Sequence, residues 1–281
     1  MAGRPVVAGT DGSEESLLAV EWAGREASLH GVPLLVLSAL APLPWMTPSA
    51  DEIVDVSRKR LERALEVAAD RAAGVAPGLK IDTQVVAGPP ARALTGLARE
   101  ASMLVTGSRG AGGFAAMILG SVSRYAATHA LCPVIVVREE TMAVHREIVV
   151  GVGDLDPAGP SHALQFAFQE AVVRTARLVA VHAWYWPVPG SRLDAPRPPE
   201  DAAARLAAAL ARYQAGYPDV EVRHDVVNAH PGRVLAGASA RADLVVLGRH
   251  ADPAAEGRGV SPVTHAVLSH AHGPVAVIPG G

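Results

Sequence analysis

Short apolar runs and longer amphipathic stretches alternate along the chain. In the first half the apolar runs predict five strands, at 4–9, 33–40, 79–87, 103–106 and 131–137. The stretches between them have helical spacing and predict helices over 14–29, 51–73, 90–100 and 122–130. Strands that alternate with helices favour a parallel sheet with right-handed crossovers. The predicted fold class is therefore α/β, a doubly wound parallel sheet with helices on both faces.

The second half repeats this layout. Apolar runs at 148–152, 177–184, 220–227 and 243–247 follow in the same order, with a helical stretch at 199–216. The repeat predicts two tandem five-stranded domains, which we place at 1–140 and 147–281 with the connection near 139–146.

A glycine-rich segment follows the strand at 103–106. Gly107 and Gly110 come first, and nine residues separate Gly110 from Gly120. Ser121 then stands where a helix begins, and we expect it to be the N-cap. Backbone amides at a helix start have no partner within the helix and favour anions, most often phosphate. The segment therefore predicts a phosphate-binding cradle.

The spacing Gly-x2-Gly-x9-Gly-Ser resembles the nucleotide-binding signature of the universal stress protein family, in its ATP-binding branch. Residues 6–13 and 131–137 are similar to that family's first and last strands. The resemblance implies the strand order 3-2-1-4-5, and ATP, with Mg²⁺, as the ligand. In that order strands one and four are neighbours, so Asp11 and Gly107 are expected to meet across the crevice at their carboxyl ends.

These arguments select twelve residues as the expected nucleotide site. The resemblance implies that Asp11 reads the base or ribose and that Ala39 lies beside the adenine, while glycines let the backbone approach the phosphates and Arg109 offers charge. The alternatives are a simple Asp-Gly turn at Asp11, a solvated arginine at 109 and ordinary helix capping after Gly120. The twelve residues are Gly9, Thr10, Asp11, Ala39, Thr106, Gly107, Arg109, Gly110, Gly120, Ser121, Val122 and Ser123.

The chain departs from the usual family pattern at two of its strand ends. Thr106 stands where an apolar residue is more usual, and Ser38 stands where histidine is frequent. In the second half His182 occupies the place that corresponds to Ser38.

Most of the glycine motif is lost in the second half. Only its first glycine is kept: Gly107, Gly110, Gly120 and Ser121 correspond to Gly248, Ala251, Ser261 and Pro262. Acidic residues within 252–256 would repel phosphates, and Pro262 has no amide proton to donate. We therefore expect one competent nucleotide site, in the first half.

Composition narrows the function further. The 281 residues carry a formal charge of −3, which gives no electrostatic case for binding nucleic acid or an anionic membrane. A single cysteine excludes an intrachain disulfide. No apolar run approaches the ~20 residues that span a bilayer, and no leader sequence is evident, so a cytoplasmic location is expected. Neither the histidines nor the cysteine are spaced as a metal site.

Signatures of common nucleotide enzymes are absent from the sequence, including the P-loop, the kinase motifs and the dinucleotide fingerprint. Three hypotheses remain open: an ATP-binding regulator of stress responses, a protein-interaction module in which nucleotide is only structural, and a slow ATPase. An unidentified protein partner is compatible with the first two. The apolar strands 134–137 and 275–278 are candidates for pairing the two halves, and dimerisation of whole chains is left open.

Overall fold

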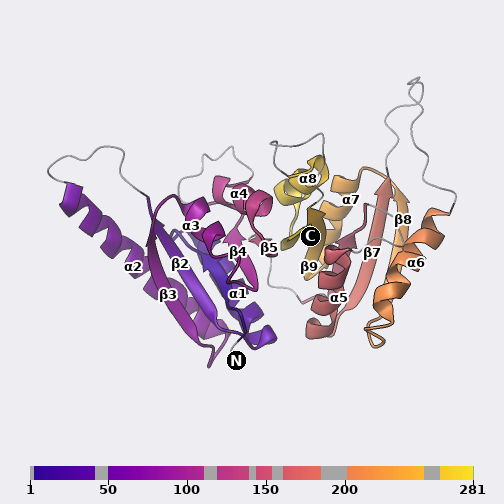
Figure 1. The fold of residues 1–281 in the computed structure, drawn as a ribbon, viewed down its shortest axis with the longest axis horizontal. Coiled ribbons are helices and arrows are strands. Elements are labelled where there is room, and N and C mark those ends of the chain that lie inside the picture. Colours follow the sequence, from indigo (N-terminus) through magenta and orange to yellow (C-terminus); the bar gives the residue numbers. More distant parts are fainter. Residues whose placement is uncertain are drawn as a thin grey trace, which may run out of the picture. The chain divides into compact units, whose positions relative to one another are not determined.

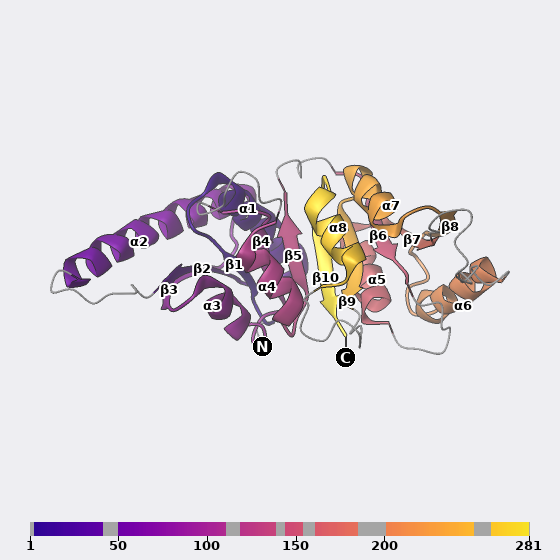
Figure 2. The ribbon, with the colours of Figure 1, turned by 90° about the horizontal axis from the view of Figure 1, so that it is seen from above.

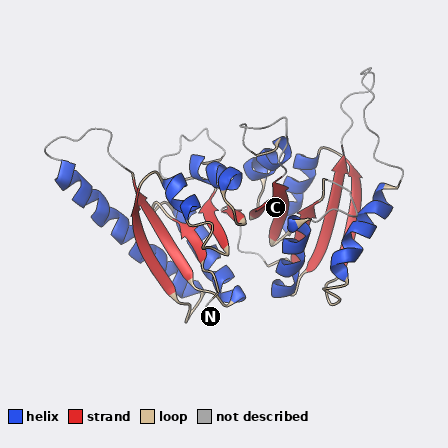
Figure 3. Cartoon of the chain, viewed as in Figure 1, coloured by secondary structure: helices blue, strands red, loops and turns tan. Residues whose placement is uncertain are grey.

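The chain divides into two compact units, Met1–Glu139 and Glu140–Gly281. The computed structural model describes residues 3–41, 50–110, 119–138, 144–153, 161–184, 201–249 and 260–280. Within these ranges each unit contains five parallel strands and the helices that cover them (Figures 1 and 3). The predicted α/β class and the tandem repeat are both confirmed. Part of the expected connection, 139–143, lies outside the described residues.

The first unit has the strand order β3-β2-β1-β4-β5, as expected. Every neighbouring pair is parallel, so all the carboxyl ends lie at one edge. Strand β4 is buried along its whole length, whereas β3, at the edge of the order, is largely exposed or half-buried. The strands are β1 (Val6–Gly9), β2 (Leu34–Leu40), β3 (Ile81–Ala87), β4 (Met103–Gly107) and β5 (Val134–Val137).

Helices pack on both faces of this sheet. Helices α1 (Glu14–His30) and α2 (Ala50–Val75) pack against each other on one face. Helices α3 (Pro90–Gly96) and α4 (Ser121–His129) pack together on the other, as Figure 2 shows. The predicted helix 90–100 is too long, because the chain leaves the helix after Gly96 and continues as hydrogen-bonded turns to Glu100.

The start of α1 follows from its sequence. Ser13 is the N-cap and accepts a hydrogen bond from the Ser16 amide. Glu14 and Glu15 occupy the first turn, where negative charge stabilises the positive end of the helix dipole. Gly31 ends the helix in the left-handed conformation, with φ of 63°. This start is fixed only a few residues after β1 ends.

The second unit repeats the arrangement in the order β8-β7-β6-β9-β10. Helix α5 packs against α6, and α7 packs against α8. The strands are β6 (Glu147–Gly151), β7 (Arg177–Trp184), β8 (Val222–Asn228), β9 (Leu244–Arg249) and β10 (Val275–Pro279). The helices are α5 (His162–Arg174), α6 (Ala202–Gln214), α7 (Pro231–Ala238) and α8 (Pro262–His270), with a 3₁₀ turn at Ser239–Arg241. Among the helices described in both units, none combines the length and apolar character needed to cross a membrane.

Candidate functional site

A cavity of about 330 Å³ opens at the carboxyl ends of β1, β2 and β4 in the first unit. All twelve residues selected from the sequence line it. Four further residues that the sequence argument did not select also line it: Ser16, Leu37, Pro90 and Leu94. The two segments that contain Asp11 and Gly107 therefore share one cavity, although they are 96 residues apart in the chain (107 − 11).

The sheet register explains why there is room at this edge. Ala8 pairs with Val105, so the next residues, Gly9 and Thr106, lie side by side. A Cβ atom on Gly9 would face the Leu94 side chain of α3 at 3.5 Å. Because Gly9 has no side chain, the space between β1 and α3 stays open.

Two hydrogen bonds hold the Asp11 side chain at the edge of the cavity. Its Oδ1 accepts hydrogen bonds from the Ser13 amide at 3.0 Å and the Ser13 hydroxyl at 2.6 Å. A Cβ atom on Gly110 would overlap Oδ2 of Asp11, so the glycine segment runs directly against the carboxylate. The turn that was the simple alternative for Asp11 is therefore present, and the same side chain also lines the cavity.

Buried hydroxyls link the end of β1 to the first turn of α1. Thr10 Oγ1 lies 2.9 Å from Ser16 Oγ and accepts a hydrogen bond from the Gly12 amide at 3.1 Å. The Ser16 hydroxyl donates to the Ser13 carbonyl at 2.8 Å. The missed residue Ser16 has a signal in the sequence, because it is the third residue after an N-cap that comes shortly after the end of a strand.

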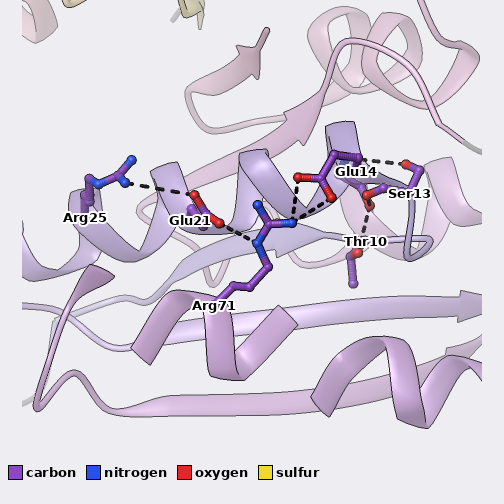
Figure 4. Close-up of polar contacts among 7 residues, drawn as sticks. Thr10, Ser13, Glu14, Glu21, Arg25 and Arg71 are labelled. Carbon is purple, nitrogen blue, oxygen red and sulfur yellow. Dashed lines mark hydrogen bonds and ion pairs between the residues drawn. The ribbon is translucent and has the colours of Figure 1, made fainter. Parts of the chain in front are cut away.

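An arginine of α2 ties α1 in place beside the cavity. Arg71 Nη1 donates to both carboxylate oxygens of Glu14, each at 2.8 Å, and Arg71 Nε donates to Glu21 (Figure 4). The hydrogen bond to Glu14 raises the pKa of Arg71 above its usual value, so the guanidinium stays charged. These contacts join α1 to α2 next to the turn that holds Asp11.

Helix α4 starts one residue earlier than expected. The N-cap is Gly120, with φ of −67° and ψ of 153°, so the prediction that Ser121 caps the helix is wrong. Gly120 has no side chain to accept a hydrogen bond, and Ser121 is already the first helical residue. Among the described residues, the amides of Ser121, Val122 and Ser123 find no acceptor. The helix start therefore keeps donors for an anion.

In the second unit, side chains occupy the place that corresponds to the cavity of the first unit. Its N-cap is Ser261, whose Oγ accepts from the Thr264 amide at 3.1 Å, and Pro262 has no amide proton. A Cβ atom on Gly151 would lie 2.9 Å from Leu235 and 3.0 Å from Leu247. Ala251 and the acidic segment 252–256 lie outside the described residues.

The packing of α1 gives Gly107 a second reason to be a glycine, beside the expected approach of a ligand. A Cβ atom there would lie 2.8 Å from the backbone oxygen of Glu15, on the α1 face of the sheet. The missing side chain lets α1 pack closely against β4, while the Gly107 backbone lines the cavity on the other side. Arg109 also lines the cavity, and its Nη2 lies 4.0 Å from Glu15 Oε1.

The absent histidine at position 38 has a structural substitute. The Ser38 hydroxyl donates to the Thr10 carbonyl at 2.5 Å. In the second unit His182 Nδ1 lies 2.8 Å from the Val152 carbonyl, and because a carbonyl only accepts, Nδ1 carries the proton. Both side chains join the second strand of their unit to the end of its first strand.

The cavity is polar at one end and apolar at the other. Leu37 and Ala39 of β2 face Pro90 and Leu94 of α3 at the apolar end. The start of α4 lies at the β4 side of the cavity, where the Ser123 hydroxyl donates to the Gly107 carbonyl, and β1 separates β4 from β2. This arrangement fits an elongated ligand with an apolar, flat part and an anionic part.

Comparison with known proteins agrees with this architecture. The sequence pattern that defines the universal stress protein family matches residues 3–138 and again residues 145–279. The chain belongs to the universal stress protein family. A universal stress protein of Mycolicibacterium smegmatis is 34% identical over 97% of this chain and 96% of its own length. One of Mycobacterium tuberculosis is also 34% identical, with the same coverage of both chains.

A solved structure supports the fold. The crystal structure of a universal stress protein from Archaeoglobus fulgidus covers all of both chains with a TM-score of 0.74 at 19% identity. The fold of this universal stress protein therefore has a counterpart among solved structures.

Proposed function

We propose that this universal stress protein binds ATP in the first unit and acts as a nucleotide-dependent regulator in the stress response. The observation that carries the proposal is the start of α4. Gly120 provides no side-chain cap there, and the amides of three lining residues, Ser121, Val122 and Ser123, have no acceptor among the described residues. A helix start of this kind suits phosphate groups. The apolar end at Leu37 and Leu94 suits the flat face of adenine.

The lining residues also fit the Mg²⁺ that accompanies ATP. Among the described residues that line the cavity, Asp11 is the one carboxylate. Magnesium in nucleotide sites is commonly held by one or two carboxylates together with phosphate oxygens and water. Asp11 would hold the ion, and the ion would supply charge that neutralises the phosphates.

The same lining supports a binding role over fast hydrolysis. The part of the lining that the structure describes contains no histidine or lysine, and Asp11 already accepts two hydrogen bonds from Ser13. A general base needs a side chain that is placed to take a proton from water, and none is offered beside the α4 amides. We therefore propose a regulator that binds the nucleotide and does not turn it over rapidly.

We also propose that only the first unit binds nucleotide. Ser261 caps α8, and Leu247 with Leu235 fills the space beside Gly151, so among the described residues the equivalent place offers fewer amide donors and less room. The test is to denature freshly purified protein, count the released nucleotide by liquid chromatography with mass detection, and titrate the emptied protein with Mg·ATP by calorimetry.

We expect about one ATP per chain in both measurements. A value of two would contradict the single-site proposal. Protein that neither carries nor takes up ATP would contradict the binding proposal and favour an interaction module that works without nucleotide.

A further inference from the structure

Thr106 carries the one buried hydroxyl of the cavity lining that has no partner in the described structure. Its residue is 4% exposed, and its Oγ1 makes no hydrogen bond. The three other buried hydroxyls of the lining are paired: Thr10 with Ser16, and Ser123, whose hydroxyl donates to the Gly107 carbonyl at 2.6 Å. A buried polar group without a hydrogen bond costs stability, so its presence needs a reason.

The fold does not require a hydroxyl at this position. In the second unit the corresponding residue is Leu247, in the same place on the fourth strand. Leu247 packs beside Gly151 together with Leu235, and the space there is filled. An apolar side chain therefore fits the strand, and in the first unit it would remove the unpaired hydroxyl.

The position of Thr106 indicates which part of a ligand it would meet. Thr106 lies beside Gly9, and the pair Gly9–Leu37 continues the same row toward β2. The row therefore runs from Leu37, over Gly9, to Thr106, and the start of α4 lies beside the end of β4, where the Ser123 hydroxyl donates to the Gly107 carbonyl. In a nucleoside triphosphate the group between the base and the phosphates is the ribose.

We infer that the Thr106 hydroxyl hydrogen-bonds a ribose hydroxyl of the bound nucleotide, and so makes the site prefer ribonucleotides over deoxyribonucleotides. The inference rests on the proposed function and deepens it. In the structure Oγ1 has almost no accessible surface, so a ligand meets it after rotation about χ1, which exchanges the places of the hydroxyl and methyl groups. A threonine hydroxyl both donates and accepts, so it can pair with a ribose hydroxyl as the donor or as the acceptor. Burial beside Gly9 shields such a bond from water.

The test uses Thr106→Val, which keeps the shape of the side chain and removes only the hydroxyl, with Thr106→Ser as the control that keeps it. Calorimetric titrations with Mg·ATP, Mg·2′-deoxyATP and Mg·3′-deoxyATP are made on the wild type and both variants. We expect Thr106→Val to bind ATP about fivefold more weakly, the value of one neutral hydrogen bond. It should also bind ATP and one of the deoxy analogues equally, whereas the wild type and Thr106→Ser prefer ATP.

A second readout separates ligand recognition from a structural role. In nucleotide-free protein, Thr106→Val should leave the midpoint of thermal unfolding unchanged or raise it, because it removes an unpaired buried hydroxyl. A lower midpoint would mean that the hydroxyl serves the fold, and would overturn the inference.

Two binding results would also overturn it. One is a Thr106→Val protein that binds ATP as tightly as the wild type; the other is an equal loss of affinity for ATP and for both deoxy analogues. In either case the wild type still binds ATP and the proposed function stands. A wild type that binds no ATP would instead refute the proposed function itself.

Discussion

Single glycines decide how closely the backbone segments of the site approach one another. Gly9, Gly107 and Gly110 are all glycines of the cavity lining, yet each would place a side chain against a different neighbour: Leu94, the Glu15 backbone and the Asp11 carboxylate. The contact with Leu94 is an ordinary one at 3.5 Å, and of the two overlaps only the Asp11 carboxylate is the end of a flexible side chain that can move. A substitution at Gly110 therefore tests Asp11 without breaking the fold.

We predict that Gly110→Ala weakens ATP binding and leaves stability nearly unchanged. The new methyl group would displace Oδ2 of Asp11, which costs little because the carboxylate can rotate, but the carboxylate would then be misplaced for Mg²⁺. Calorimetry with Mg·ATP and thermal unfolding of the nucleotide-free protein measure the two effects.

The control is Gly96→Ala at the end of α3, where a Cβ atom meets nothing within 4 Å. It should keep the affinity and gain about 0.5–1 kcal/mol in stability, the usual gain from replacing a helical glycine with alanine. If Gly110→Ala bound ATP as well as Gly96→Ala does, Asp11 would have no part in binding.

At the scale of elements, two helix starts with the same position in their units differ in how their amides are used. Both α4 and α8 follow the fourth strand of their unit, and both are nine residues long. Helix α4 has a glycine cap and open amides, whereas α8 has a serine cap and a proline. A cap that satisfies the helix removes the donor that an anion would use.

We therefore predict that Gly120→Ser weakens ATP binding at least about tenfold, the effect of losing one hydrogen bond to a charged group. The new hydroxyl would accept from the Ser123 amide, as Ser261 accepts from Thr264 at 3.1 Å. The Ser108 carbonyl, at 3.2 Å from the new Cβ atom, has to shift slightly. Calorimetry measures the affinity, and urea unfolding should show a change of only a few tenths of a kcal/mol.

The reverse exchange, Ser261→Gly, is the matched control. It should cost a few tenths of a kcal/mol in stability and leave ATP affinity unchanged. An unchanged affinity in Gly120→Ser would show that the amide of Ser123 does not contact the phosphates.

The sequence predicts elements better than it predicts the purpose of single residues. Periodicity and the repeat predict every strand described in the first unit, because buried parallel strands are nearly continuous apolar runs. The glycine spacing predicts which segments share the cavity. It does not predict that Gly107 serves α1, that Gly120 is the cap, or that Leu37, Pro90 and Leu94 complete the lining. Those facts depend on which side chains of different strands and helices face one another, and the pattern within one element does not determine that. That the twelve selected residues bind nucleotide stays a prediction.

At the scale of the whole molecule, the two units share a fold but differ in the residues at the place of the candidate site. Both units keep the strand order and the packing of paired helices, so the architecture tolerates two different sets of residues at its strand ends. Where the first unit has Thr106 and Gly120, the second has Leu247 and Ser261. Among the described residues, the second unit therefore retains what burial requires, but it has fewer open amides at this helix start and less space at the strand ends.

This difference predicts where ATP stabilises the chain. Binding stabilises the folded state by an amount that grows with the logarithm of ligand concentration, about 2.7 kcal/mol at one hundred times the Kd. Amides that contact the ligand, or that open only when the site opens, should exchange more slowly.

Hydrogen exchange followed by mass spectrometry should therefore show ATP-dependent protection in peptides that cover Gly107 and the start of α4. Peptides that cover β9 and the start of α8 should exchange at the same rate with and without ATP. The Gly120→Ser variant, at an ATP concentration that saturates only the wild type, supplies the control, because protection should then fade in the first unit. Equal protection of α4 and α8 would mean that the second unit binds nucleotide despite its serine cap and its proline, and the single-site proposal would be wrong.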